Sequence, residues 1–225
     1  QFTSQATVRG KPVAEPPPAL AFRGEGATWQ VTLAVERLAA RTVAEVFNLI
    51  TIGDGVVGGS ATIRYGILNQ GVQQFKVRLP AHWRNVDFTG ANIRRQDHDT
   101  NVWTLSLQDK AWGGYTLVIT FDYPFDTKKA TIDAAGAHPL EVEREEGTLA
   151  VTAAPGLTLE APRLLEPLRP IDPTELSETD RALINRPVLL AARYNGTNFN
   201  LSLNLTRHDE VATLDAVADR AQLTS

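Results

Sequence analysis

Alternation of apolar and polar residues with a period of two is the feature of this sequence that most limits its fold. Rows of alternate apolar residues occupy positions 29–35, 61–67, 75–79, 103–107, 115–123 and 199–205. A strand points successive side chains to opposite faces, so each row predicts a half-buried strand. Clusters of turn-forming residues separate the rows, and Gly113-Gly114 is expected to be one such turn. The pattern predicts an all-β fold made of antiparallel β-sandwich modules.

One segment departs from this alternation. Asp172-Pro173-Thr174-Glu175 combines a capping residue, a proline at the first helical position and an acidic first turn. Apolar residues follow at Leu176, Leu183 and Ile184, so one short helix is predicted near 173–184. The tail over 211–225 has apolar residues at helical spacing, and an extended conformation is the alternative there.

Proline-rich segments mark the expected connections. Four prolines between positions 11 and 19 predict a stiff, extended lead-in over residues 1–25. Five more lie between positions 153 and 173, where we expect a long surface crossing. We therefore expect a β-sandwich module over 26–136 and a second β-rich module over 137–225 that is truncated at its C-terminal end. A single continuous sheet system is the alternative to this division.

The charge distribution, the absence of cysteine and the length of the apolar runs exclude several classes of function. The 22 basic and 26 acidic residues are spread along the chain, without the basic stripe that is typical of a nucleic-acid-binding protein. The chain has no cysteine, which excludes disulfides, thiolate metal sites and thiol catalysis. No apolar run reaches the roughly 18–20 residues of a membrane span. The chain starts at Gln1 and has no methionine, so we expect both ends to be cuts in a larger protein.

A composite of four segments resembles a β-sandwich unit of large exported bacterial proteins that have no assigned activity. The segments are a strand ending in Leu79-Pro80, a short strand and turn, a strand bearing Trp103, and a closing strand from Tyr115 (residues 72–80, 86–90, 102–105 and 115–121). Residues 142–151, 187–194 and 219–224 are similar to further parts of such proteins. The resemblance implies sandwich architecture, an extracytoplasmic location (periplasm or cell surface), neighbouring modules in the same polypeptide, and an extended tail. It implies no catalytic residue.

A glycine-rich segment matches the dinucleotide-binding pattern G-x-G-x-x-G over residues 53–58. That function requires a helix directly after the glycines, because the helix N-terminus binds the pyrophosphate. The residues that follow, 60–66, alternate as a strand does. We therefore interpret the segment as a turn between strands.

Two acidic segments are considered as a cation site and as a catalytic site. Asp97 and Asp99 supply oxygen atoms at alternate positions, but the glycine and glutamate of a calcium loop are replaced by Val102 and Gln108. We interpret this loop as a polar hairpin tip, with a cation site as the alternative. A glutamate row at positions 141, 143 and 145 predicts a solvated sheet edge, with acid–base catalysis as the less favoured alternative. We nominate no catalytic residue, no metal site and no cofactor, and expect a protein that is not an enzyme.

Trp83 and Trp112 lie outside the alternating rows and are the candidate ligand-binding residues. Exposed aromatic side chains on a β-sandwich stack on sugar rings or anchor protein partners. The alternative is that each covers an end of the core, since tryptophan is highly buried on average. The sequence thus favours a structural or interaction module that contacts a protein or glycan partner. A carbohydrate-binding module is the second hypothesis.

Overall fold

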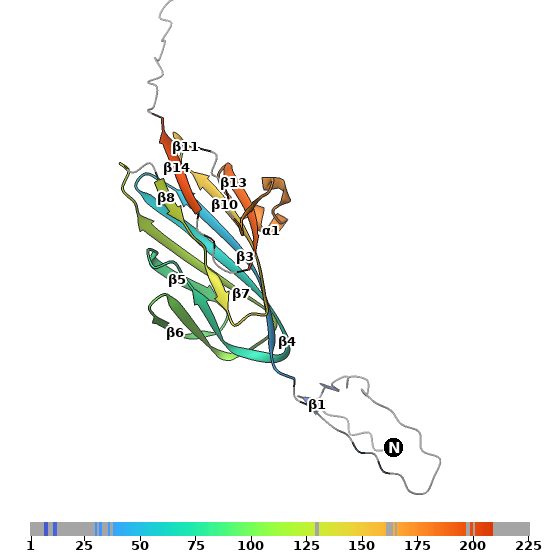
Figure 1. Cartoon of the computed structure of the whole chain (residues 1–225). Helices are drawn as coiled ribbons and strands as arrows, with labels where there is room; N and C mark the ends of the chain where they lie inside the picture. The colour runs from blue at the N-terminus through green and yellow to red at the C-terminus, as the bar shows by residue number, and fades with distance from the viewer. Residues whose placement is uncertain are drawn as a thin grey trace, which may run out of the picture. The chain divides into compact units, whose positions relative to one another are not determined.

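A computed structural model describes the fold of this chain over most of its length (Figure 1). The chain divides into two compact units, residues 1–37 and 38–225, which are described separately. In the first, β1 (Thr7–Val8) pairs with β2 (Lys11–Pro12) in an antiparallel hairpin. The expected lead-in and the row at 29–35 lie largely outside the described residues, and the tail over 211–225 lies wholly outside them. The described residues are 7–8, 11–12, 30, 32, 36, 38–128, 131–160, 164, 166–196, 199 and 201–208.

The all-β prediction for this chain is confirmed. Strands make up 66% of the described residues and helices 4%. The apolar rows point inward as the alternation predicts: Ala61, Ile63, Tyr65 and Ile67 are all buried. None of the helices in the described ranges has the length and apolarity that crossing a membrane requires.

The second unit is organised around its two longest strands, β4 (Val56–Arg78) and β7 (Val102–Pro124). They pair with each other along most of their length, but the register shifts between Ile67 and Val72. The hairpin bends there, with Asn69 and Gly113 in the left-handed conformation at φ 68° and 69°. The predicted turn at Gly113-Gly114 is therefore wrong, because these residues continue β7 through the bend instead of ending a strand.

This bend folds one sheet over itself and creates two layers. Tyr65, before the bend, stacks on Phe75, after it, with ring centroids 4.3 Å apart. Phe75 also stacks on Tyr115, at 4.8 Å. Residues ten positions apart on one strand therefore face each other across the core, and the sandwich is closed by aromatic contacts between its layers.

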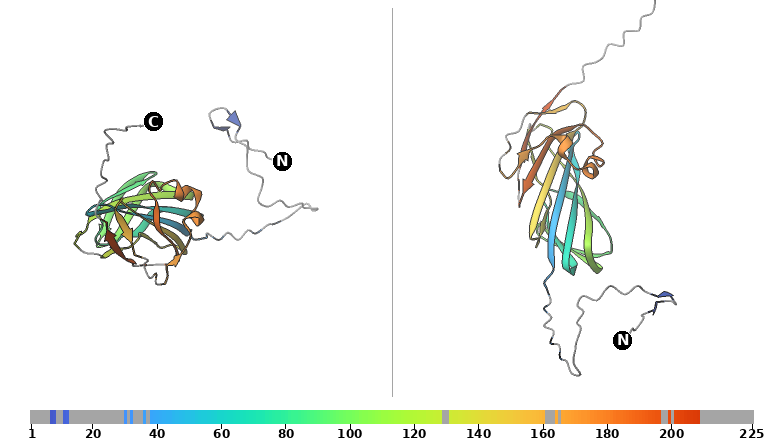
Figure 2. Two further views of the ribbon diagram at one scale, coloured as in Figure 1. Left: turned by 90° about the horizontal axis from the view of Figure 1, so that it is seen from above. Right: turned by 90° about the vertical axis from the view of Figure 1, so that its right-hand side faces the viewer.

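The first layer has the strand order β12-β13-β10-β3-β4-β7-β5, using the half of β4 before the bend and the half of β7 after it. Four of these strands lie side by side in the right-hand view of Figure 2 (yellow β10, blue β3, cyan β4 and green β7). The bounds of its shorter members are β3 (Arg41–Ile52), β5 (Arg84–Gly90), β10 (Arg144–Ala153), β12 (Arg169–Pro170) and β13 (Val188–Asn195).

The second layer consists of the remaining halves of β4 and β7, flanked by β9 (His138–Leu140) and β6 (Ile93–Asp99). A three-stranded sheet of order β11-β14-β8 adds Ile132, Leu201 and Leu203 to the same buried core. Its members are β8 (Thr131–Ala134), β11 (Leu157–Leu159) and β14 (Leu201–Arg207).

The expected division near residue 137 does not separate two sheets. β9 pairs with β4, and β10 pairs with β3, so strands on both sides of position 137 share one sheet and one core. Strands β3 to β7, β9, β10, β12 and β13 thus belong to one sheet. The β3–β10 pair is parallel, unlike the other ladders described, and a parallel pair needs a long connection. Here that connection contains β4 to β9, which local patterns could not reveal.

The predicted short helix near 173–184 is present as two turns, a 3₁₀ turn η1 (Pro173–Glu175) and α1 (Glu178–Arg181). Asp172 and Glu175 form the capping box that the sequence indicated. Between the turns, Leu176 packs on the outer face of the first layer. It covers a second small core there, made of Phe47, Leu49, Ala150 and Ala191.

The glycine-rich segment 53–58 is a turn between strands, as predicted. Gly55, at φ 79°, lies between β3 and β4, and Gly53 N donates to Val56 O at 2.8 Å. β4 follows directly, so the segment has no helix whose N-terminus could bind a phosphate.

Candidate interaction site

Trp83 lies in the turn before β5 and belongs to the core. Only 6% of it is exposed, and its ring stacks on Phe121 with centroids 3.4 Å apart and planes 7° from parallel. This is the arrangement that the core-covering alternative describes. A ligand has no open face of Trp83 to stack on.

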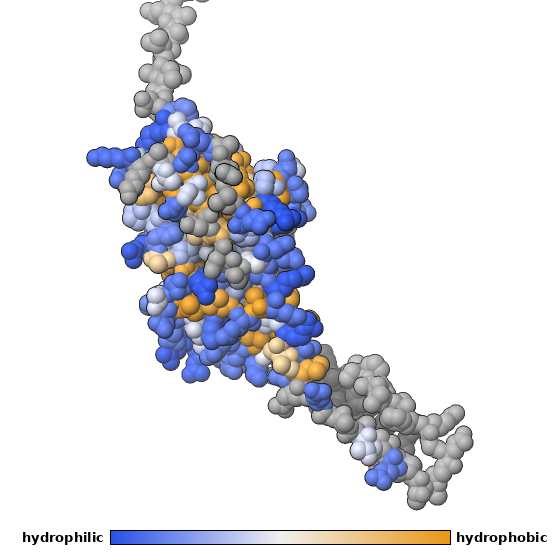
Figure 3. Space-filling model, in the orientation of Figure 1, coloured by the Kyte–Doolittle hydropathy of each residue, from blue (hydrophilic) through white to orange (hydrophobic). Residues whose placement is uncertain are grey.

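Trp112 has the opposite environment, because it lies at the bend of β7 with 62% of its surface exposed. Its indole packs on the backbone of Gly71 in β4, where an added Cβ would lie 2.5 Å from Cε2. Leu38 and Leu68, exposed by 58% and 53%, lie at the same end of the sheet. Figure 3 shows hydrophobic surface at this end of the unit. We call Leu38, Leu68 and Trp112 the bend surface.

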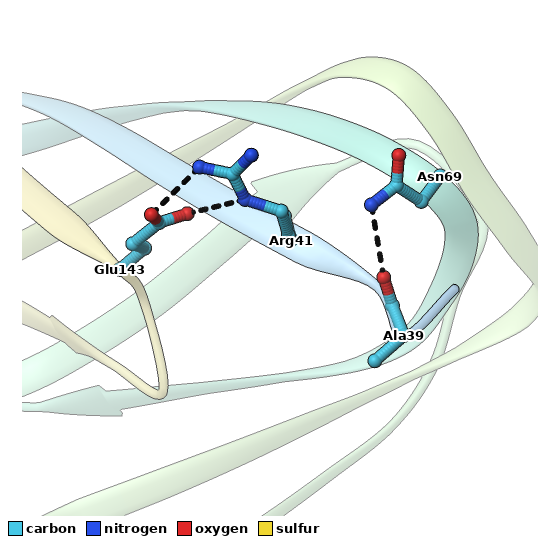
Figure 4. A network of polar contacts seen from close by, with 4 residues as sticks. All are labelled: Ala39, Arg41, Asn69 and Glu143. Atoms are coloured by element: carbon cyan, nitrogen blue, oxygen red, sulfur yellow. Dashed lines mark hydrogen bonds and ion pairs between the residues drawn. The ribbon is translucent and has the colours of Figure 1, made fainter.

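Polar contacts fix the chain around the bend surface (Figure 4). Asn69 Nδ2 donates to Ala39 O at 3.2 Å, and Gln70 Nε2 donates to Leu38 O. Arg41 donates two hydrogen bonds to Glu143, at 2.8 and 2.7 Å. The hydrogen bond to Arg41 lowers the pKa of the Glu143 carboxyl, and the same bond raises the pKa of Arg41. The exposed apolar groups therefore project from a backbone that is held at several points.

Asp97 and Asp99 lie at the end of β6, in the hairpin that leads to β7. Asp97 accepts from Arg95 Nε at 2.9 Å, and Asp99 accepts from Thr100 Oγ1 at 3.3 Å. Thr100 has a φ of 55°, which suits a tight turn. The loop is thus the polar hairpin tip that the sequence favoured. The part of the chain with described side chains contains no cluster of three or more metal-binding residues.

The glutamate row separates into three environments. Glu141 pairs with Lys76 at 2.6 Å, and Glu143 pairs with Arg41. Glu145, predicted to be solvated, is buried with its side chain only 2% exposed. The prediction was wrong for Glu145 because Glu141, at φ 59°, interrupts the extended backbone. The chain then crosses from β9 in one layer to β10 in the other, so alternation does not relate the three residues.

Glu145 belongs to a buried polar cluster that sequence patterns missed. His138 Nδ1 lies 2.8 Å from Glu145 Oε1, so this pair connects β9 to β10 between the layers. Nearby, Asn48 Nδ2 donates to the Tyr194 hydroxyl and Ala137 N donates to Asn48 Oδ1, both at 3.0 Å. The one available signal was Asn48 itself, a polar residue within the apolar run Val46-Phe47-Asn48-Leu49-Ile50.

Burial dominates the electrostatics of this cluster. Glu145 and Tyr65 are both paired to Ala44, whose small side chain separates them on the inner face of the sheet. Burial raises the pKa of the Tyr65 and Tyr194 hydroxyls, and the charge of Glu145 raises both further. Glu145 Oε2 and the Tyr65 hydroxyl have no hydrogen-bond partner among the described residues.

A carboxylate that holds one nitrogen of a histidine can orient it for acid–base catalysis. A hollow of about 160 Å³ reaches His138, but no hydroxyl or thiol side chain lines it in the described part of the chain. The geometry of His138 and Glu145 suits a contact between layers.

No protein-family model matches the chain, and no curated protein matches it. Trp112 is the most exposed large hydrophobic side chain among the described residues, and the chain around it is held by the hydrogen bonds of Asn69, Gln70 and Arg41.

Proposed function

We propose that residues 38–225 are a non-catalytic interaction module of a larger extracytoplasmic bacterial protein. The observation that carries this proposal is the exposure of Trp112, 62%, beside Leu38 and Leu68. Scattered apolar side chains are common on surfaces, but a tryptophan grouped with two leucines has the composition of a contact site. The bend surface would dock on a neighbouring module or partner protein.

A non-catalytic role is supported by the placement of the ionisable residues. His138 and Glu145 are enclosed, and the exposed acids Asp97, Glu141 and Glu143 are each engaged with a basic side chain. The extracytoplasmic location rests on the resemblance to exported bacterial sandwich proteins. Absence of cysteine is compatible with that location but does not require it.

Site-specific photo-crosslinking in the full-length protein tests the docking role. A photoreactive residue replaces Trp112 in one variant and Leu183, which is 47% exposed beside α1, in the control. We expect a discrete crosslinked product from position 112 that disappears when Leu68→Asp is added. Equal products from both positions, or none from position 112, would contradict the proposal.

A second candidate function, carbohydrate binding, is favoured by how Trp112 packs. The indole rests on Gly71, which leaves ring surface exposed for the C–H groups of a sugar to stack on. Titration with a panel of polysaccharides should quench tryptophan fluorescence, and Trp112→Ala should abolish the quenching while Trp103→Phe preserves it. No quenching across a broad panel would exclude this candidate and leave protein docking.

A further inference from the structure

Two arginines face each other on the outer surface of the first layer. Arg169 in β12 is directly paired with Arg193 in β13. Leu168 and Tyr194, the neighbours of these arginines, are buried, so both guanidinium groups point outward. Directly paired residues of antiparallel strands have Cβ atoms about 4.5–5.5 Å apart, so two positive charges are held side by side.

Neither arginine forms an ion pair with any residue that the structure describes. Among the acidic side chains that line the hollows beside these arginines, Glu146 pairs with Arg144 at 3.1 Å, and Asp180 pairs with Arg64 at 2.6 Å. Glu166 lines the same hollow as both arginines but forms an ion pair with neither of them. Glu175 accepts from Asp172 N at 3.0 Å. Like charges directly opposite each other destabilise a sheet. An anion between Arg169 and Arg193 would remove that repulsion.

Arg193 also lies where two hollows meet. The first, of about 460 Å³, runs over β10, β3 and β4 beside the η1–α1 segment. The second, of about 510 Å³, lies along β12 and includes Arg169. Both are within the range of small-molecule sites. The first is lined by hydroxyls and carboxylates, namely Thr148, Ser177, Thr179, Glu45 and Glu146.

We propose that Arg169 and Arg193 bind the carboxylate of a hexuronate unit in an acidic polysaccharide. A guanidinium group makes paired hydrogen bonds to a carboxylate, which a lysine cannot reproduce. A uronate ring carries one charge and several hydroxyls, so the hydroxyls can donate to Glu45 and Glu146 in the adjoining groove. An acidic peptide has no side-chain hydroxyls to donate to these carboxylates, so it would gain only the contact with the arginines. This site is separate from the bend surface and does not depend on it.

Calorimetric titration of the whole chain with tetragalacturonate tests the proposal, with its methyl ester as the uncharged probe. We expect binding of the acid alone, weakened by added salt because the contact is ionic. Arg193→Gln and Arg169→Gln should each reduce the affinity roughly tenfold or more, the effect of losing a charged hydrogen bond. Arg193→Lys should retain part of it.

Matched controls separate binding at this arginine pair from binding at a single surface arginine or at Trp112. Arg84, an exposed arginine on β5, has no ion pair among the described residues, so Arg84→Gln should bind as the unmodified protein does. Trp112→Ala should also bind normally, which distinguishes this proposal from carbohydrate binding at the bend surface. Melting temperatures should not fall in Arg169→Gln or Arg193→Gln, because each removes a repulsion. Equal binding of the ester, equal binding of tetraglutamate, or affinity unchanged in both variants would overturn the proposal.

Discussion

Glu143 and Glu145 are separated by one residue, yet they lie in opposite environments. The side chain of Glu143 is 50% exposed and paired with Arg41 at the bend of the sheet. That of Glu145 is 2% exposed and paired with His138 between the layers. Surface ion pairs contribute little to stability, whereas removing one partner of a buried pair leaves a buried polar group without its hydrogen bond. We therefore expect Glu143 and Glu145 to differ greatly in their contribution to the stability of the fold.

The same contrast separates the two candidate tryptophans. Trp83 is buried against Phe121, while Trp112 projects from the bend beside Gly71. One contributes to folding, and the other is available for contact. In both comparisons the residue type is the same. The difference is whether the side chain points into the core or out toward solvent.

The largest loss of stability is expected when the buried glutamate, Glu145, is replaced. Glu145→Ala should lower the free energy of unfolding by about 4 kcal/mol, because His138 would lose its hydrogen-bond partner and the deleted side chain would leave a cavity in the core. Glu143→Ala, the matched control, should leave stability unchanged within error. Urea unfolding followed by circular dichroism measures both. Similar midpoints for the two variants would show that the buried pair does not hold the layers together.

Trp83→Ala tests the tryptophan comparison. Loss of a buried indole that stacks on Phe121 should cost about 3 kcal/mol, because it leaves a cavity in the core. Trp112→Ala should change stability by less than about 0.5 kcal/mol, as is usual for exposed positions. Thermal denaturation of both variants provides the measurement. A larger loss for Trp112→Ala would mean that the bend surface is part of the core and not a contact site.

Gly147→Ala tests how tightly the interior is packed near the buried glutamate. Gly147 is paired with Tyr194, whose ring covers it so closely that a Cβ would overlap Cζ. Moving that ring also disturbs its hydrogen bond from Asn48, and we expect a loss of about 2 kcal/mol. Gly114→Ala is the control, since a Cβ there meets no atom within 4 Å. Equal stabilities of the two variants in guanidinium would contradict the close packing.

The last prediction has no effect at neutral pH and concerns alkaline pH alone. Burial raises the pKa of all four tyrosines, and burial together with nearby Asp133 raises the pKa of Tyr123 to about 12. An unfolded tyrosine ionises near pH 10, so the unfolded chain loses these protons before the folded one does. Stability should therefore be retained below about pH 10 and fall as the pH rises toward 12.

Absorbance of tyrosinate at 295 nm measures this difference directly. The folded protein should show almost no tyrosinate at a pH where the urea-unfolded protein is largely ionised. If both samples titrate together, the tyrosine hydroxyls are accessible to water and the core assignment of their rings is wrong.

Local patterns in the sequence determined the two longest strands and the last one, and they did so because alternation follows from the pleat alone. The rows at 61–67 and 75–79 lie in β4, those at 103–107 and 115–123 in β7, and the row at 199–205 reaches into β14. The turn at Gly55 and the capping box at Asp172 were equally readable, since each depends on a few adjacent residues.

Only the tertiary structure decided how these strands are arranged. β3 was not recognised from its sequence because residues 46–50 are buried on both faces, one side in the main core and the other beneath Leu176. The bend of the β4–β7 hairpin, the parallel pairing of β10 with β3 and the burial of Glu145 all depend on contacts between distant residues. The pairing of Arg169 with Arg193 does so too. Alternation fixes which side chains share a face, but the partner of that face is set by the path of the whole chain.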